Sequence, residues 1–334
     1  MAEIQQEDRA PNNKTRGGAA PSDTRPLPPL GAHVSTAGAL ANAERTARRL
    51  GAEAIQVFSS NPRRWHMHAY SEDDLAAFGK NLRRRNVQLF VHTSYLINLA
   101  SPDGVLRERS AAALAGAYSF GRATSATALV THVGSHRGDG FVAAKTRIVE
   151  TIRRARDTLE GELPQLLLET SAGGGHSVGA SIAELGELVA LLGPGIGVCL
   201  DTAHLFAAGV PIHTVSGLDR LICSLHKAKL VGKVGLIHFN DSATGLGSKR
   251  DRHANLWEGV IGRDGLMLAL AHPLFREVPF ILEVPGFDGR GPDVRNMRRA
   301  RLMRRALEAA APGDPPGAAA SRRFPQPPDG PVEP

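Results

Sequence analysis

The chain has 334 residues, of which 42% are hydrophobic, so it is long enough to bury a large core. Its formal net charge of +7 and its pI of about 9.8 fit an anionic partner such as nucleic acid, and fit equally well arginine-rich helix faces that are only solvated. The two cysteines, Cys199 and Cys223, exclude a disulfide framework and a cysteine-based zinc site, and favour a reducing compartment.

The two ends of the chain differ in composition from its middle. Residues 1–28 and 311–334 are polar and rich in proline, and they are predicted to be disordered tails around a single domain at 29–310. No apolar run approaches the ~18 residues that span a membrane, and the N-terminus lacks the apolar core of a signal peptide. We therefore expect a cytoplasmic protein without membrane contacts.

Short apolar runs that end in polar or ionisable residues recur between the tails. They predict eight strands, at 30–35, 54–61, 88–94, 128–135, 165–170, 196–202, 234–241 and 278–284. In the segment that follows the first run, TAGALANAERTARRL at 36–50, the apolar residues Leu40, Ala43, Ala47 and Leu50 share one helical face. Further helices are predicted at 72–85, 103–122, 142–160, 181–192, 216–230, 264–272 and 293–310.

This alternation of strand and helix determines the expected fold class. It predicts a parallel sheet that closes into a (β/α)8 TIM barrel, and the alternative is a doubly wound open sheet. In a TIM barrel the active site forms at the C-terminal ends of the strands, so the residues that follow each predicted strand are the candidates for chemistry.

Nine side chains that can bind a metal lie at the ends of these strands or in the segments that follow them. They are His92, His132, Glu169, Asp201, His204, His238, Asp251, His253 and Glu283. One histidine or carboxylate at a strand end is usually a hydrogen-bonded or helix-capping residue, but that explanation does not cover so many consecutive strands. Four carboxylates buried together would repel one another, and divalent metals would remove that cost.

The type and number of these side chains restrict the metal and the chemistry. Imidazole and carboxylate ligands without cysteine suit zinc, manganese or iron, and nine ligands fit three metals that share a carboxylate. Clustered divalent ions suit phosphoryl transfer, so a basic protein with this site is predicted to hydrolyse phosphodiesters in nucleic acid. The alternatives are a sugar or keto-acid isomerase with one or two metals, and a DNA-binding protein with structural metal and no turnover.

The barrel segment also carries an ordered set of specific motifs. They are GAHVSTAGAL (31–40), HTSYLINLASP (92–102), THVGSH (131–136), ETSAGGG (169–175), CLDTAHLFAAG (199–209), HFNDS (238–242) and GSKRDRHANLWEGVIG (247–262). Together they closely resemble endonuclease IV, the metal-dependent apurinic/apyrimidinic endonuclease family of base excision repair. The resemblance runs from about Gly31 to Gly286.

The resemblance implies three zinc ions in a (β/α)8 barrel, and manganese is the expected substitute. It assigns His92, His132 and Glu169 to the first ion. It implies that Glu169 bridges to a second ion and orients the attacking hydroxide. The rest of the second set is Asp201, His238 and Glu283, and the third set is His204, Asp251 and His253.

The resemblance further implies hydrolysis of the phosphodiester 5′ to an abasic site, which leaves a 3′-hydroxyl and a 5′-deoxyribose phosphate. Removal of blocking groups from 3′ ends is implied as well. The expected partner is double-stranded DNA with abasic sites or blocked 3′ ends, bound by a monomer that associates with the nucleoid through this DNA.

Two loops are implied to contact this DNA. Arg63, in SSNPRRW at 59–65, is expected to enter the minor groove, and Tyr95 and Leu96 are expected to fill the gap left by the extruded abasic nucleotide. The chain departs from the family at Pro62, before Arg63, and at Trp257, where the family usually has glycine. Neither departure removes a ligand, so both bear on substrate fit rather than on metal binding.

Overall fold

The structure is a computed structural model that describes residues 27–65 and 70–308. The tails predicted at 1–28 and 311–334 therefore lie outside the described residues, apart from Leu27 and Pro28. None of the helices within the described ranges is long and apolar enough to cross a membrane.

Eight parallel strands form a closed barrel in the order β1-β10-β7-β6-β5-β4-β3-β2. The strands are β1 (Leu30–His33), β2 (Ala54–Phe58), β3 (Gln88–His92), β4 (Ala128–His132), β5 (Gln165–Glu169), β6 (Ile196–Asp201), β7 (Val234–His238) and β10 (Phe280–Leu282). Each lies within a predicted run. The closed sheet confirms the predicted TIM barrel and excludes the doubly wound alternative.

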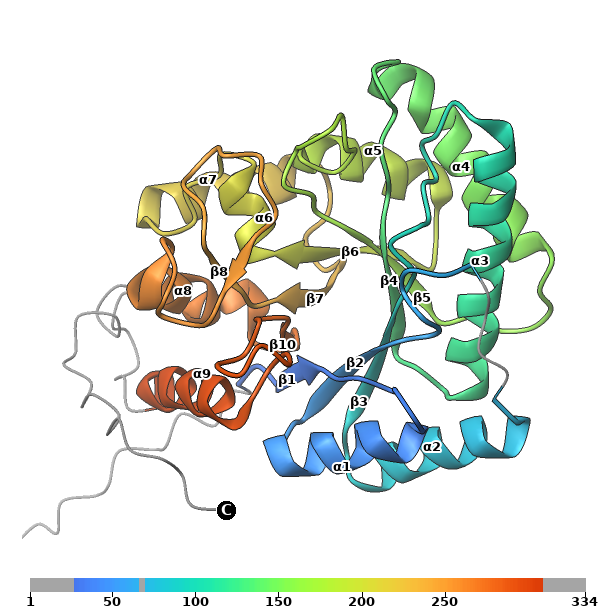
Figure 1. The fold of residues 1–334 in the computed structure, drawn as a ribbon. Coiled ribbons are helices and arrows are strands. Elements are labelled where there is room, and N and C mark those ends of the chain that lie inside the picture. The colour runs from blue at the N-terminus through green and yellow to red at the C-terminus, as the bar shows by residue number, and fades with distance from the viewer. Residues whose placement is uncertain (1–26, 66–69, 309–334) are drawn as a thin grey trace, which may run out of the picture.

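Helices surround the barrel on its outside (Figure 1). They are α1 (Leu40–Leu50), α2 (Glu72–Arg84), α3 (Gly104–Ala123), α4 (Phe141–Asp157), α5 (Ile182–Leu192), α7 (Val215–Lys227), α8 (Gly262–Ala271) and α9 (Val294–Glu308). The apolar face predicted for the first of them is the buried face of α1. These helices cover the outer side of the strands, so both faces of the sheet are buried.

Some short elements were not predicted. The helix α6 (Thr202–Ala207) begins directly after Asp201, whose carboxylate accepts a hydrogen bond from the backbone N–H of His204. The strands β8 (Asp241–Ser242) and β9 (His253–Ala254) pair antiparallel after β7, and a 3₁₀ turn covers Pro273–Phe275. Elements this short carry no periodic pattern of hydrophobic residues.

The interior of the barrel explains where the polar residues lie. Its lower part is packed with apolar side chains, namely Ala54, Phe90, Ala128, Val130, Leu167, Cys199, Leu236 and Ile281. Residues two positions apart on a strand share a face. The residue two positions after Phe90, Leu167 or Leu236 therefore also points inward, one layer closer to the C-terminal mouth, where a polar cluster forms.

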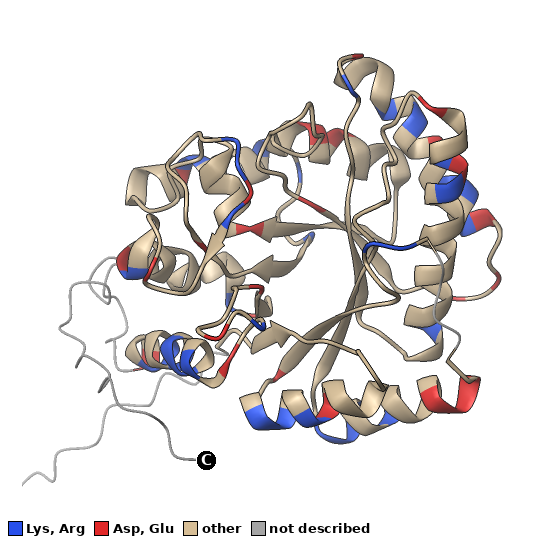
Figure 2. Cartoon of the chain, in the orientation of Figure 1, with Lys and Arg blue, Asp and Glu red and all other residues tan. Residues whose placement is uncertain are grey.

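Several arginines of α9 attach this last helix to the rest of the barrel. Arg301 donates to the backbone carbonyls of Leu50 and Gly51, and Arg304 forms an ion pair with Glu53. Figure 2 shows basic residues along α9, which lies outside the barrel strands. Arg301 and Arg304 thus hold α9 against the barrel.

Candidate metal centre

The structure brings all nine predicted side chains together at the C-terminal mouth of the barrel. Six come from the ends of β3 to β7 and from the residue that follows β10; they are His92, His132, Glu169, Asp201, His238 and Glu283. His204 comes from α6, and Asp251 and His253 come from the segment that follows β8. The loop-borne residues thus reach the same place as the strand-borne ones.

The first group of ligand atoms surrounds one oxygen of Glu169. His92 Nε2 lies 3.0 Å from Glu169 Oε2, and His132 Nδ1 lies 3.5 Å from the same oxygen. His92 and Glu169 are buried, whereas the side chain of His132 is 30% exposed. This is the set that the family resemblance implies for a first ion, and its three donor atoms lie close to one another.

The second group surrounds Nδ1 of His238. This nitrogen lies 3.1 Å from Glu169 Oε1, 3.8 Å from Asp201 Oδ2 and 3.2 Å from Glu283 Oε2. The two oxygens of Glu169 therefore serve different groups, one on each side of the carboxylate. This geometry is the one expected for a bridging carboxylate.

The third group contains a residue that the sequence interpretation did not include. His253 Nε2 lies 3.3 Å from Asp251 Oδ1 and 3.5 Å from Asp201 Oδ2. His204 Nε2 lies 3.2 Å from Asp251 Oδ2. Asp201 thus lies in both the second and the third group, so the cluster contains a second shared carboxylate. The spacing of residues along the chain does not reveal that Asp201 lies in two groups.

Four of the five histidines use one ring nitrogen to make a hydrogen bond that leaves the other free for the cluster. Nδ1 donates to a backbone carbonyl in three of them, at 2.8 Å for His92 to Thr93, 2.9 Å for His204 to Thr170 and 3.2 Å for His253 to Glu283. His238 instead uses Nε2, which donates to the side chain of Gln56. Such bonds set the tautomer and the ring orientation of metal-binding histidines.

The electrostatics of Glu169 and Asp251 favour their ionised forms. Burial opposes the ionisation of Glu169, but the charges of His132 and His238 and the hydrogen bonds from His204 and His238 outweigh it, so its pKa lies well below the usual value. Burial also opposes the ionisation of Asp251, yet its hydrogen bond to His204 and the positive charges around it lower its pKa to about 2. The cluster thus concentrates negative charge at one place.

The pKa values of His132 and His204 are shifted in opposite directions. Burial lowers the pKa of His132 and outweighs the nearby charge of Glu169. Burial also opposes the charging of His204, but Asp201 and Asp251 raise its pKa well above the usual value. A raised pKa lets His204 carry a positive charge against these carboxylates, and divalent cations at the same atoms would provide that balance instead.

The donor set fits divalent metals on two observations. The atoms are imidazole nitrogens and carboxylate oxygens, the ligand types of zinc and manganese, and cysteine contributes none. In addition, Nε2 of His253 is buried and has no hydrogen-bond partner, although it points at two carboxylates. A buried nitrogen without a partner is costly, and a cation bound there would remove the cost.

A buried aspartate holds the loop that delivers Asp251 and His253. Asp241 accepts hydrogen bonds from the backbone N–H groups of Ser242, Trp257, Gly259, Ile261 and Gly262, at 2.9–3.1 Å. In the same segment β8 pairs with β9, which places His253 opposite Ser242. The polar loop is therefore fixed at both ends over the barrel mouth.

The two predicted DNA-contacting loops lie side by side. The carbonyl of Pro62 accepts hydrogen bonds from the Tyr95 N–H at 3.2 Å and from the Ser94 hydroxyl at 2.9 Å. Proline keeps this carbonyl, so the substitution is compatible with the contact. Arg63 is exposed, Leu96 is half-buried, and the side chain of Tyr95 is 58% exposed.

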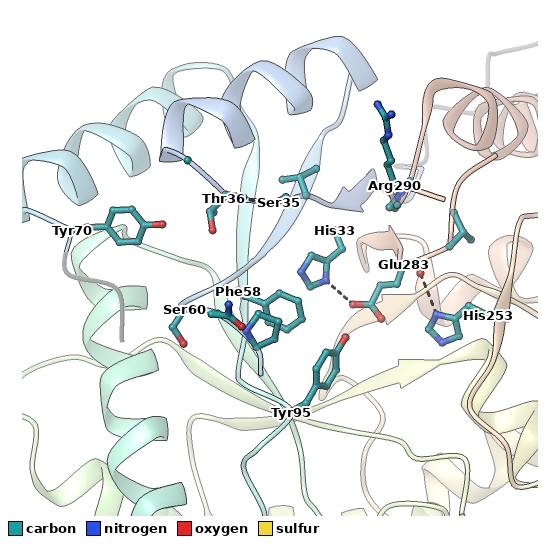
Figure 3. A pocket seen from close by; sticks show the side chains of 18 residues that line it. His33, Ser35, Thr36, Phe58, Ser60, Tyr70, Tyr95, His253, Glu283 and Arg290 are labelled. Carbon is teal, nitrogen blue, oxygen red and sulfur yellow. Dashed lines mark hydrogen bonds and ion pairs between the residues drawn. The ribbon is translucent and has the colours of Figure 1, made fainter. Parts of the chain in front are cut away.

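A pocket of about 570 Å³ opens beside the cluster, between the loops that follow β1, β2 and β10. Figure 3 shows Tyr95, His33 and Glu283 pointing into it, with Arg290 at its edge. The pocket is lined by both the predicted metal ligand Glu283 and the predicted DNA-contacting residue Tyr95. It gives the cluster an open side that a substrate can reach.

Trp257 adopts a backbone conformation that favours glycine, with φ of 73°. Its indole packs against α9, where Nε1 lies 3.2 Å from the sulfur of Met303 and the Arg299 guanidinium lies 5.1 Å from the ring centroid. The indole therefore contacts an outer helix, which does not support its use as a stacking surface for DNA.

Known proteins share both the sequence and the fold of this chain. Residues 45–309 match the family described as "Xylose isomerase-like TIM barrel". The "Probable endonuclease 4" of Halothermothrix orenii is 40% identical over 271 residues, which cover 79% of this chain and 96% of that protein. The protein of the same name from Streptomyces coelicolor is 36% identical over a match that covers 85% of this chain and 98% of that protein.

Solved structures separate the family from the wider fold. Endonuclease IV from Thermus thermophilus has a TM-score of 0.73 at 35% identity, and the match covers 85% of this chain and 100% of that one. A D-psicose 3-epimerase has a TM-score of 0.58 at 17% identity, a likeness of the fold alone. Sequence and structure agree, and the chain belongs to the endonuclease IV family of xylose isomerase-like TIM barrels.

Proposed function

We propose that this protein is a metal-dependent apurinic/apyrimidinic endonuclease of base excision repair. It hydrolyses the phosphodiester 5′ to an abasic site and leaves a 3′-hydroxyl and a 5′-deoxyribose phosphate, and it also removes blocking groups from 3′ ends. The observation that carries the proposal is the meeting of nine imidazole and carboxylate side chains at one barrel mouth. The relatives named endonuclease 4 support it.

The proposed cofactor is three zinc ions, with manganese as a substitute. Each group would hold one ion, and the carboxylates of Glu169 and Asp201 would each face two of them. Asp251 would complete the third set, because its two oxygens face His204 and His253. Sharing carboxylates lowers the number of buried negative charges that the three cations require.

Bound divalent ions would polarise the phosphodiester and stabilise charge on the attacking and leaving oxygens. The chain's own contribution is to hold the reacting groups in position. Glu169 is held by His92 on one oxygen and by His238 on the other, so it can orient an attacking hydroxide without moving. Asp251 stands on the exposed side, where the substrate enters.

Arg63, Tyr95 and Leu96 would recognise the damaged duplex. Pulling a nucleotide out of the stack costs a few kcal/mol and least where the base is missing, so an abasic site is the preferred substrate. The ring of Tyr95 lies beside His92 and His132, with centroid distances of 5.9 and 6.2 Å. A side chain that fills the gap in the duplex would thus hold the extruded nucleotide next to the first group.

The decisive experiment maps the cut in a duplex that carries one abasic analogue. The zinc-loaded protein is incubated with the duplex labelled on the damaged strand, and the same duplex without the analogue is the control. We expect a single cut 5′ to the analogue, with a 3′-hydroxyl on the upstream product. A cut on the 3′ side, or no cut by protein that holds zinc, would refute the proposal.

The same experiment separates the alternatives. A sugar isomerase on this barrel would leave the duplex intact, and so would a DNA-binding protein with structural metal, but the latter would still bind the abasic duplex. Measuring binding and incision on one sample distinguishes the two. The loops that carry Asp251 and Arg63 favour the nuclease, because an isomerase needs neither.

A further inference from the structure

Gln56 is a buried polar residue in the middle of β2, among the inward-facing residues of the barrel. Its side-chain amide reaches across the barrel mouth to the two ligands of the second group that come from β7 and the segment after β10. His238 Nε2 donates to Gln56 Oε1 at 2.9 Å, and Gln56 Nε2 donates to Glu283 Oε1 at 2.6 Å. One amide therefore links two proposed ligands that come from different strands.

The bond to His238 determines which ring nitrogen is free. With Nε2 protonated and bonded to Gln56, the lone pair of this histidine is on Nδ1, the atom that faces Glu169, Asp201 and Glu283. His92, His204 and His253 obtain the same control from backbone carbonyls, which no side-chain substitution removes. His238 instead depends on a side chain for its tautomer.

The bond to Glu283 determines which carboxylate oxygen is free. Oε1 accepts a hydrogen bond from Gln56 Nε2 and a second one, of 2.8 Å, from His33 Nδ1. The two donor nitrogens are 2.9 Å apart, and Figure 3 shows the bond from His33. Oε2 lies on the other side of the carboxylate, 3.2 Å from His238 Nδ1. Both ligands thus present one atom to the same point.

We propose that Gln56 is the positioning residue of the second metal group, with His33 as its partner on Glu283. This inference rests on the proposed function, because it assumes that the group holds a divalent ion. Gln56 does not touch the ion; it holds the tautomer of His238 and the rotamer of Glu283. Side chains with this role typically change metal affinity by ~10–100-fold when they are replaced.

The orientation of the amide is part of the proposal. If the amide were turned around, its NH2 group would face His238 Nε2 and would require the proton of that ring to move to Nδ1. The ring would then present a proton to the metal group instead of a lone pair. The short contact to a carboxylate oxygen fixes the observed orientation, because only the NH2 end can donate to Glu283.

The test compares Gln56→Met with the unchanged protein. Methionine keeps the length and volume of the side chain and removes both hydrogen bonds. Each protein is dialysed at graded free zinc, and the zinc per chain is measured by mass spectrometry. We expect the parent to hold three ions, and the variant to lose one of them at a free zinc concentration ~10–100-fold higher than the parent does. Added zinc should restore incision by the variant.

Gln165→Met is the matched control. Gln165 lies on the same inward face, at the start of β5 and four residues before Glu169, at the opposite end of the barrel. This change should leave the zinc titration unchanged, although it alters packing near Gly197 and Gly235. A purely structural effect of replacing an inward-facing glutamine would appear in both variants.

The outcomes separate the inference from the proposed function. If the parent holds zinc and Gln56→Met holds it equally tightly, the positioning role is refuted while the endonuclease proposal stands. If the parent itself binds no zinc, both fall. Gln56→Glu is the second variant if the methionine variant does not fold. It retains the acceptor for His238 but places a second carboxylate against Glu283. Zinc affinity weaker than the parent's supports the positioning role, and an unchanged zinc affinity refutes it.

Discussion

The residues proposed to bind metal and those proposed to contact DNA differ in what holds them in place. His92, Asp201 and His238 stand at strand ends and are at most 2% exposed. Tyr95 is 58% exposed, and Arg63 stands on a loop where its backbone N–H donates to the side chain of Asn61 and the Pro62 carbonyl accepts from the neighbouring loop. These three residues are positioned by the barrel strands, whereas the DNA-contacting residues are positioned by two adjacent loops.

This difference has a functional meaning. Buried ionisable groups must be paired or charge-balanced, so a change in one of them disturbs all the others. Exposed loop residues are surrounded mainly by water, so a substitution there disturbs few neighbouring side chains. Substitutions in the cluster should therefore affect metal content and catalysis together, whereas substitutions in the two loops that carry Arg63 and Tyr95 should affect DNA binding alone.

Glu169→Gln should have the largest effect. The neutral amide removes the charge shared by the first and second groups while it preserves the size of the side chain. Replacing a residue that only hydrogen-bonds to a metal ligand typically lowers activity by up to ~100-fold. We expect the incision rate of this variant to fall by more than that, and the bound zinc to drop by at least one ion per chain. Incision rate and zinc content measure this, and Glu187→Gln at an exposed ion pair with Lys145 is the control. Three zinc ions retained in the Glu169 variant would rule out the bridge.

His132→Ala should rank second. Its imidazole belongs to the first group alone and is partly exposed at the rim, so the barrel should remain folded. We expect most of the activity and at least one zinc to be lost, with the far-UV circular dichroism unchanged. His226→Ala, at an exposed position on α7, should change neither. Full activity in His132→Ala would refute its assignment as a ligand.

Arg63→Ala tests the other side of the comparison. We expect weaker binding to abasic duplex, and a slope of log affinity against log salt that is smaller by about 1 if the guanidinium contacts a phosphate. Zinc content should stay at the parent value. Arg84→Ala, at the exposed end of α2 before the start of β3, should leave both quantities unchanged. A loss of zinc in Arg63→Ala would show that the loop supports the cluster.

The same contrast explains what the sequence could and could not reveal. His92 and His238 were predictable, because each ends an apolar run, and a parallel barrel brings all strand ends to one mouth. Asp251 and His253 were candidates because they follow the seventh strand, but their assignment to a third ion came from the resemblance to a family, since no rule of spacing brings a loop back across the barrel. The β8–β9 pairing that does so involves two residues on each strand.

Gln56 and the sharing of Asp201 were missed for different reasons. Gln56 lies in the middle of a strand, where a polar residue carries no motif; its inward direction, two positions after Ala54, was the available signal. The sharing of Asp201 depends on side-chain rotamers and on α6, which turns His204 back over the strand. Distances of this kind arise from packing rather than from order along the chain.

Trp257 provides the smallest and most local prediction. Its φ of 73° costs a non-glycine residue of order 1 kcal/mol, while its indole gains contacts with Arg299 and Met303. Trp257→Gly loses the contacts and the strain together, so the free energy of unfolding should change by less than about 1 kcal/mol. Trp257→Ala loses the contacts but keeps the strain.

The alanine variant should therefore be less stable than the glycine variant by about 1 kcal/mol, although alanine normally stabilises a chain relative to glycine. Denaturant unfolding of the two zinc-loaded variants measures this difference directly. Zinc content and incision should match the parent in both, because the indole faces α9 and Asp241 still holds the loop through its backbone N–H groups. An alanine variant as stable as the glycine one would mean that the loop relaxes freely, and the rigid delivery of Asp251 and His253 would need another explanation.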